Sequence, residues 1–231
     1  MIKQLLCISV LAFCLQACGE TANTSQAEAT EAVKEAAETV EETVEKVMGV
    51  INPNQAGAEA LTALGLNEGM VKAITDNRPF LSQGALNTAL ASMGDSDMLK
   101  GLAEKLFVPI NLNTASREEI LLVPGVGERM AHEFEEYRPY KKIDQFRREM
   151  GKYVSDEEIA NYEKYVFVPV ELNSASKEEI MAIPGVGERI AHEFEEYRPY
   201  TSIEQFRREL GKYVDDKELA RLERYVRLDK E

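Results

Sequence analysis

Hydrophobic residues along most of the chain recur at steps of three and four, which is the spacing of an amphipathic α-helix. The pattern is clearest between residues 117 and 166, where it predicts several short helices separated by turn residues. The expected inward positions are Met130, Ala131, Phe134 and Tyr137 in one helix, Ile143, Phe146 and Met150 in the next, and Ile159, Tyr162 and Val166 in the last. The sequence therefore predicts an all-α fold.

A shorter helix is expected just before these. Ser116 is followed by Glu119 at the spacing of a capping box, and the next apolar residues, Ile120 and Val123, fall on one face. The residues 124–127 read Pro-Gly-Val-Gly, through which a helix does not continue. We therefore expect a helix, a tight turn and a second helix, the latter over about 128–137.

This pattern occurs twice. Residues 110–169 and 170–228 align without gaps at an offset of 60, and the capping box returns as Ser176 and Glu179, ahead of Ile180 and Ile183. The identical stretches include 124–127 with 184–187, 131–140 with 191–200, and 145–149 with 205–209. Residues 167–172, between the two copies, are expected to be an extended connector.

A degenerate copy precedes them over 50–109. Arg78-Pro79-Phe80 parallels Arg138-Pro139-Tyr140, and Gly65-Leu66-Asn67 stands where the other copies have Gly-Val-Gly. Asn is among the few non-glycine residues that tolerate positive φ, so we expect the turn to survive with Asn67 in that conformation. The sequence thus predicts three tandem units of about 60 residues.

The N-terminus has a different character. Lys3 precedes about thirteen mostly apolar residues, which is too short to span a bilayer and matches the hydrophobic region of a signal peptide. Residues 15–18 read Leu-Gln-Ala-Cys, which resembles the bacterial lipobox. The resemblance implies a signal peptide over 1–17 and a lipid on Cys18. An ordinary secretory signal and a short buried helix are the alternatives.

The resemblance has consequences for location and for disulfides. Gly19 after the cysteine implies a lipid-anchored protein of the outer membrane, facing the periplasm, if the cell has two membranes. The cysteines are Cys7, Cys14 and Cys18, so cleavage before Cys18 would leave the folded body none with which to form a disulfide.

Residues 18–49 are expected to form an acidic tether. The part from 19 to 31 is small and polar, which is typical of a flexible linker. From 32 to 48 a thin stripe of Val and Ala recurs at helical spacing among glutamates. Two heptads are too few to indicate a coiled coil, so a helical spacer and a self-association helix both stay open.

Composition argues against an enzyme. The 231 residues contain two His and three Cys, which leaves little material for a nucleophilic triad or a metal cluster. His132-Glu133 and His192-Glu193 lack a second His four residues later, so no zinc-protease helix is present. We expect no catalytic residue, no metal and no cofactor.

A helix, a Pro-Gly-Val-Gly turn and a second helix resemble the helix-hairpin-helix motif. With the Asn113-Thr114-Ala115-Ser116 lead-in and the 60-residue repeat, the chain resembles the competence DNA-receptor family (ComEA-type). The resemblance implies DNA binding without sequence specificity. The implied phosphate-binding residues are Gly125, Val126, Gly127 and Arg129, and again Gly185, Val186, Gly187 and Arg189.

The physical basis of such a site does not depend on the resemblance. Glycine lets a backbone approach closely, and the first N–H groups of a helix are unpaired donors at its positive end. They donate hydrogen bonds to a phosphate oxygen without reading bases. The alternative is that the glycines only form the turn and let two helices pack.

The distribution of charge gives arguments both against and for binding to DNA. The net charge of −14 opposes binding to a polyanion, but residues 19–49 alone carry −6, so the expected units are only mildly acidic. A second Gly-x-Gly turn is missing at 151–154, and glutamates follow Arg129. Supporting basic residues are expected on the exposed side of the third helix of each unit: Arg147, Arg148 and Lys152, and Arg207, Arg208 and Lys212.

Two functions stay open at this point. One is a lipid-anchored envelope protein that binds DNA weakly, for uptake or retention. The other is a protein-interaction or structural module that kept the hairpin shape without binding DNA, as the similar fold of the extrinsic U subunit of photosystem II illustrates. The sequence names no protein partner.

Overall fold

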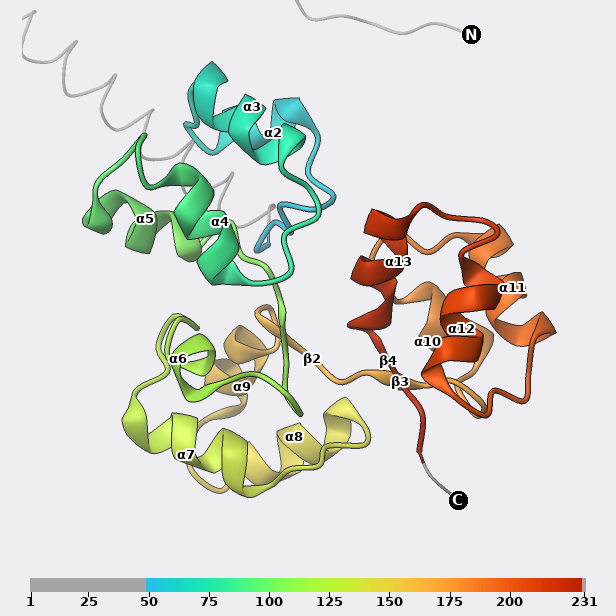
Figure 1. Cartoon of the computed structure of the whole chain (residues 1–231). Helices are drawn as coiled ribbons and strands as arrows, with labels where there is room; N and C mark the ends of the chain where they lie inside the picture. Colours follow the sequence, from blue (N-terminus) through green and yellow to red (C-terminus); the bar gives the residue numbers. More distant parts are fainter. Residues whose placement is uncertain (1–48, 230–231) are drawn as a thin grey trace, which may run out of the picture. The chain divides into compact units, whose positions relative to one another are not determined.

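The structure, a computed structural model, describes residues 49–229 (Figure 1). The predicted signal peptide, Cys18 and nearly all of the predicted tether lie outside the described residues. Within 49–229, no helix is both long and apolar enough to cross a membrane.

The described chain is mostly helical, as the sequence predicts. Four helices lie in the first segment, residues 50–109: α2 (Ala58–Ala63), α3 (Glu68–Asp76), α4 (Gln83–Leu90) and α5 (Ser96–Ala103). The second segment, residues 110–169, contains β1 (Ile110–Asn111), α6 (Arg117–Ile120), α7 (Glu128–Glu136), α8 (Ile143–Met150), α9 (Asp156–Tyr162) and β2 (Val166–Phe167). The third segment, residues 170–228, contains β3 (Val170–Glu171), α10 (Lys177–Met181), α11 (Glu188–Glu196), α12 (Ile203–Leu210), α13 (Asp216–Glu223) and β4 (Val226–Arg227).

Short parallel strands join the start of each segment to its end, a feature that the sequence analysis missed. Ile110 pairs with Val166, Val170 pairs with Val226, and an isolated bridge joins Ile51 to Leu106. Each pairing satisfies backbone groups that a buried connector would otherwise leave without partners. The expected extended connector is therefore the end of one such pair and the beginning of the next.

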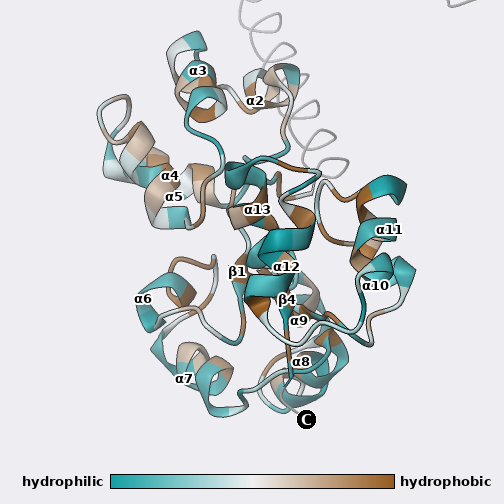
Figure 2. Ribbon diagram, turned by 45° about the vertical axis from the view of Figure 1, so that its right-hand side comes forward, coloured by the Kyte–Doolittle hydropathy of each residue, from teal (hydrophilic) through white to brown (hydrophobic). Residues whose placement is uncertain are grey.

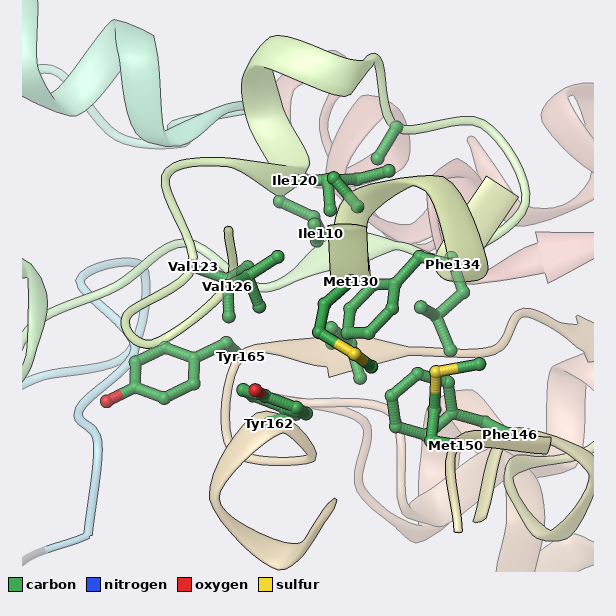
Figure 3. Close-up of a cluster of buried hydrophobic side chains, with 14 of the residues drawn as sticks. Ile110, Ile120, Val123, Val126, Met130, Phe134, Phe146, Met150, Tyr162 and Tyr165 are labelled. Carbon is green, nitrogen blue, oxygen red and sulfur yellow. The ribbon is translucent and has the colours of Figure 1, made fainter. Parts of the chain in front are cut away.

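Hydrophobic side chains form a separate buried cluster in each segment. Figure 3 shows the cluster of the second segment, where Phe134 packs edge-on against Phe146 with ring centroids 4.9 Å apart. Hydrophilic and hydrophobic positions alternate along helices such as α7 and α11, as their amphipathic sequence predicts (Figure 2).

One phenylalanine from each preceding segment enters the next cluster. Phe107 contacts Tyr165 in the second cluster with ring centroids 5.1 Å apart, and Phe167 contacts Tyr225 in the third at 4.2 Å. Edge-to-face and offset aromatic contacts of this kind add to the stabilisation from burial. The clusters are therefore linked in series through residues that follow the last helix of each segment.

The predicted capping boxes are confirmed. Ser116 and Ser176 accept hydrogen bonds from the N–H groups of Glu119 and Glu179, whose carboxylates bond back to the serine N–H groups. Ser155 makes a third box at the start of α9. These boxes satisfy donors at helix starts that would otherwise bind water or a ligand.

Candidate nucleic-acid interface

The turn between the two hairpin helices depends on one glycine in each segment. Gly65, Gly125 and Gly185 have φ values of 84°, 81° and 79°. This left-handed conformation is strained for residues with a Cβ, so glycine is required here. The first segment thus keeps the same turn as the other two.

Val126 and Val186 support the turn from inside. Both are buried, and Val126 lies in the second cluster in Figure 3. Their N–H groups donate to the carbonyls of Val123 and Ile183 at 3.0 Å. Because these amides are already used, the open donors nearby are those of the first turn of the following helix.

Gly127 and Gly187 are the N-caps of α7 and α11, and no side chain caps either helix. Their φ values of about −100° are accessible to any residue, and a Cβ at either position would meet nothing within 4 Å. Neither backbone geometry nor space therefore demands glycine. Its effect is that the N–H groups at the start of α7 and α11 have no side-chain acceptor.

The first segment differs at this position, and our expectation for Asn67 was wrong. Asn67 has φ −73° and ψ 166°, and the positive φ belongs to Gly65. The side chain of Asn67 accepts a hydrogen bond from the N–H of Met70 at 3.0 Å. The turn survives because Gly65 is present, while Asn67 closes the helix start that Gly127 and Gly187 leave open.

Arg129 and Arg189 are exposed in the first turns of α7 and α11. The guanidinium of Arg129 lies 5.7 Å from the ring centre of Tyr153, and that of Arg189 donates to the carbonyl of Tyr213 at 3.3 Å. Among the residues that the structure describes, neither arginine has a carboxylate partner at ion-pair distance. The matching position of the first segment is Gly69.

The predicted supporting basic residues are exposed, but each pairs with an acid. Arg147 donates to Glu163 at 2.6 and 3.0 Å and to Asp144 at 2.7 Å, and Arg207 likewise binds Glu223. Lys152 lies in the turn after α8, because that helix ends at Met150. The local positive charge is thus smaller than the sequence suggests.

The other four supporting basic residues pair with two buried carboxylates. Glu149 accepts from Arg148 at 2.7 Å and from Lys152, and Glu209 binds Arg208 and Lys212 in the same way. Glu149 is 8% exposed. The hydrogen bond from Lys152, followed by that from Arg148, holds the pKa of Glu149 below its ordinary value.

Sequence reasoning missed these two glutamates, although a signal was present. Glu149 lies three residues after Phe146 and beside Met150, so helical periodicity places it at the edge of the buried face. Its spacing of three from Lys152 allows an ion pair across one helical turn. Attention to charged residues on the apolar face would have found the pair.

Most of the tyrosines contribute to the packing of the buried clusters. Tyr140, Tyr162 and Tyr165 are buried, while the hydroxyls of Tyr137 and Tyr153 lie 2.8 Å apart. Tyr197 and Tyr213 repeat this hydroxyl pair, and His132 and His192 are exposed helical residues. No group of three metal-binding side chains occurs in residues 49–229.

Two ion pairs that the sequence did not predict link the two helices of each uncapped hairpin. Lys177, the first residue of α10, contacts Glu188, the first residue of α11, at 2.6 Å. Arg117 contacts Glu128 at 3.1 Å in the same positions of the second segment. Cations therefore sit next to the uncapped helix starts on the side of the preceding helix.

The comparisons with known proteins agree with this geometry for the third segment. The sequence model of the family described as helix-hairpin-helix motif matches residues 166–227, which run from β2 through β4. This motif is generally associated with DNA binding without sequence specificity. Searches of the curated proteins and of the solved structures found no match to this chain.

Proposed function

We propose that the protein is a lipid-anchored cell-envelope protein that binds DNA weakly and without sequence specificity. The proposed contacts are the N–H groups at the starts of α7 and α11, together with Arg129 and Arg189. Its role would lie in DNA uptake or retention, as the resemblance to the competence DNA-receptor family suggests, and it would not be an enzyme.

The observation that carries the proposal is the contrast at the N-caps. Asn67 caps α3, whereas Gly127 and Gly187 leave α7 and α11 without a side-chain acceptor although a Cβ would fit. An uncapped helix start costs stability, because Asn is a better N-cap than Gly by a few tenths of a kcal/mol. Open amides at two helix starts, each with an arginine in the first turn of the same helix, are suited to backbone phosphates.

Weak binding follows from the charges. Within residues 49–229, each of the two uncapped hairpins offers one arginine without a carboxylate partner, and the neighbouring basic residues are bound to carboxylates. Affinity for DNA rises with the number of phosphates neutralised, so we expect a Kd of about 10⁻⁴–10⁻⁶ M that weakens steeply with salt. An anchor on Cys18 would offset such weakness, since it would hold many copies at one surface.

One observation favours a second candidate function, that of a protein-interaction module. The supporting basic residues Arg147, Arg148 and Lys152 form ion pairs within their own segment. Basic residues that are already paired with carboxylates of the same segment are less available to bind the phosphates of DNA.

The test is a titration of the full chain against fluorescent duplex DNA at several salt concentrations. The variant Gly127→Asn with Gly187→Asn copies the cap of Asn67 into both hairpins. We expect it to lose DNA affinity at least about tenfold while its thermal unfolding midpoint stays the same or rises.

Gly57→Asn is the matched control, since Gly57 is also an uncapped N-cap with free space but precedes a helix outside the uncapped hairpins. We expect it to leave DNA affinity unchanged. If the full chain shows no binding at about 50 mM salt, DNA binding is excluded and the interaction module becomes the better account.

A further inference from the structure

The ion pair between Lys177 and Glu188 lies at the start of α11, where the proposed phosphate would bind. Glu188 directly follows the N-cap Gly187, so its carboxylate is in the first turn of the uncapped helix. Lys177 Nζ lies 2.6 Å from Glu188 Oε2. Glu188 thus adds negative charge at the positive end of α11, and its carboxylate also binds a cation from α10.

This pair is exposed, in contrast to those of the buried carboxylates. The side chain of Glu188 is 74% exposed and that of Lys177 is 40% exposed, whereas Glu209 is only 12% exposed. Exposed pairs contribute little and are screened by salt, whereas breaking a buried pair leaves a charge without water or a partner. Lys177 can therefore exchange the exposed Glu188 for another anion at little cost.

The second segment has a matching ion pair, in which the cation Arg117 is bound by two carboxylates. Arg117 contacts Glu128 at 3.1 Å and also Glu135 at 2.6 Å, so it keeps one partner if the other leaves. In the third segment Lys177 has Glu188 as its ion-pair partner, and Glu195 only favours its charge at longer range, which adds slightly to the raised pKa of Lys177.

We propose that Lys177 is a phosphate ligand of the α10–α11 hairpin, bound to Glu188 until a nucleic-acid phosphate displaces that carboxylate. The inference rests on the proposed function and adds to it a residue and a mode of control. A phosphate at the start of α11 meets the helix amides and repels Glu188, and the ammonium of Lys177 then transfers from carboxylate to phosphate. Arg117 does the same to a smaller degree, because Glu135 retains it.

A double-mutant cycle on the full chain tests this transfer against duplex DNA. Glu188→Gln removes the competing charge and frees Lys177, and we expect affinity to rise about three- to tenfold at 50 mM salt. The same change in a Lys177→Gln background is expected to alter affinity by less than about twofold, because no cation remains to be released.

Glu196→Gln is the control for charge alone, since Glu196 is exposed at the other end of α11. We expect it to change affinity by less than about twofold. Glu128→Gln should give a smaller gain than Glu188→Gln. Lys177→Gln loses one phosphate contact, so its slope of log K against log salt should be shallower than that of the native chain by about 0.9.

Equal gains from Glu188→Gln and Glu196→Gln, or a gain that persists without Lys177, overturn the inference while leaving DNA binding in place. Absence of binding by the native chain and by every variant overturns both the inference and the proposed function. Thermal unfolding of each variant shows whether it is folded during the titration.

Discussion

The side chain of Asn113 exchanges two hydrogen bonds with the backbone of Tyr140. Asn113 Nδ2 donates to the carbonyl of Tyr140 at 2.8 Å, and the N–H of Tyr140 donates to Asn113 Oδ1 at 2.7 Å. Asn173 with Tyr200 and Asn54 with Phe80 repeat the arrangement. This amide latch fastens the start of each segment to the corner after its second helix.

Asn113→Ala should destabilise the protein, because both backbone groups of the buried Tyr140 lose their partner. The expected loss in free energy of unfolding is about 1–3 kcal/mol, measured by urea denaturation. Asn113→Asp should also destabilise the protein, because it places a carboxylate oxygen against the Tyr140 carbonyl that Asn113 Nδ2 binds.

Thr114→Ala is the control for the latch. Thr114 is exposed, and we expect its loss to change stability by less than about 0.5 kcal/mol. A latch variant as stable as Thr114→Ala would show that water replaces the amide and that the latch contributes nothing.

The buried glutamates predict a dependence of stability on pH. The pKa values of Glu149 and Glu209 are lowered in the folded chain, chiefly by hydrogen bonds from Lys152 and Lys212. A lowered pKa stabilises the fold fully above the ordinary value of 4.5, and this stabilisation is lost as pH falls through the lower folded value. The contribution should therefore be present at pH 7 and should decrease as the pH falls below 4.5.

Glu149→Gln with Glu209→Gln tests this dependence. The double variant should unfold at a lower urea concentration than the native chain at pH 7, and the gap between the two midpoints should narrow as pH falls below 4.5. A gap of the same size at pH 7 and pH 3 would show that packing, and not the ionised carboxylates, accounts for the difference.

Removal of the cap at Asn67 predicts separate outcomes for stability and binding. Asn67→Gly takes away the acceptor for the N–H of Met70, so we expect a loss of a few tenths of a kcal/mol up to about 1 kcal/mol. DNA affinity should not increase, because residue 69 is Gly where the other segments have Arg129 and Arg189. A clear gain would mean that open amides suffice without an adjacent arginine.

Local sequence was enough to predict the helices and the hairpins. The capping box of Ser116 and Glu119, the glycine at 125 and the apolar spacing of Met130 and Phe134 are set by interactions within a few residues. The N-cap formed by Asn67 could have been predicted from local sequence as well. Asn is favoured both at positive φ and at N-caps, and Asn67 is an N-cap because Gly65 supplies the positive φ of the turn.

Contacts between distant residues decided the rest. The strand pairs join residues 56 apart, such as Ile110 and Val166, and periodicity carries no information on such pairings. Glu163 lies 16 residues from Arg147 and Glu188 lies 11 residues from Lys177, so these two pairs could not be predicted from local spacing, although the exposure of the cations could.

The sequence by itself determined an all-α chain with glycine turns and two uncapped hairpin helices, because these depend on local backbone preferences. Only the tertiary structure decided the ion pairs between helices, such as Arg147 with Glu163 and Lys177 with Glu188, because these depend on which helices pack together. Arg129 and Arg189 remain unpaired with acids in the described chain, and the predicted supporting cations do not. That difference sets how strongly this acidic protein could attract a polyanion.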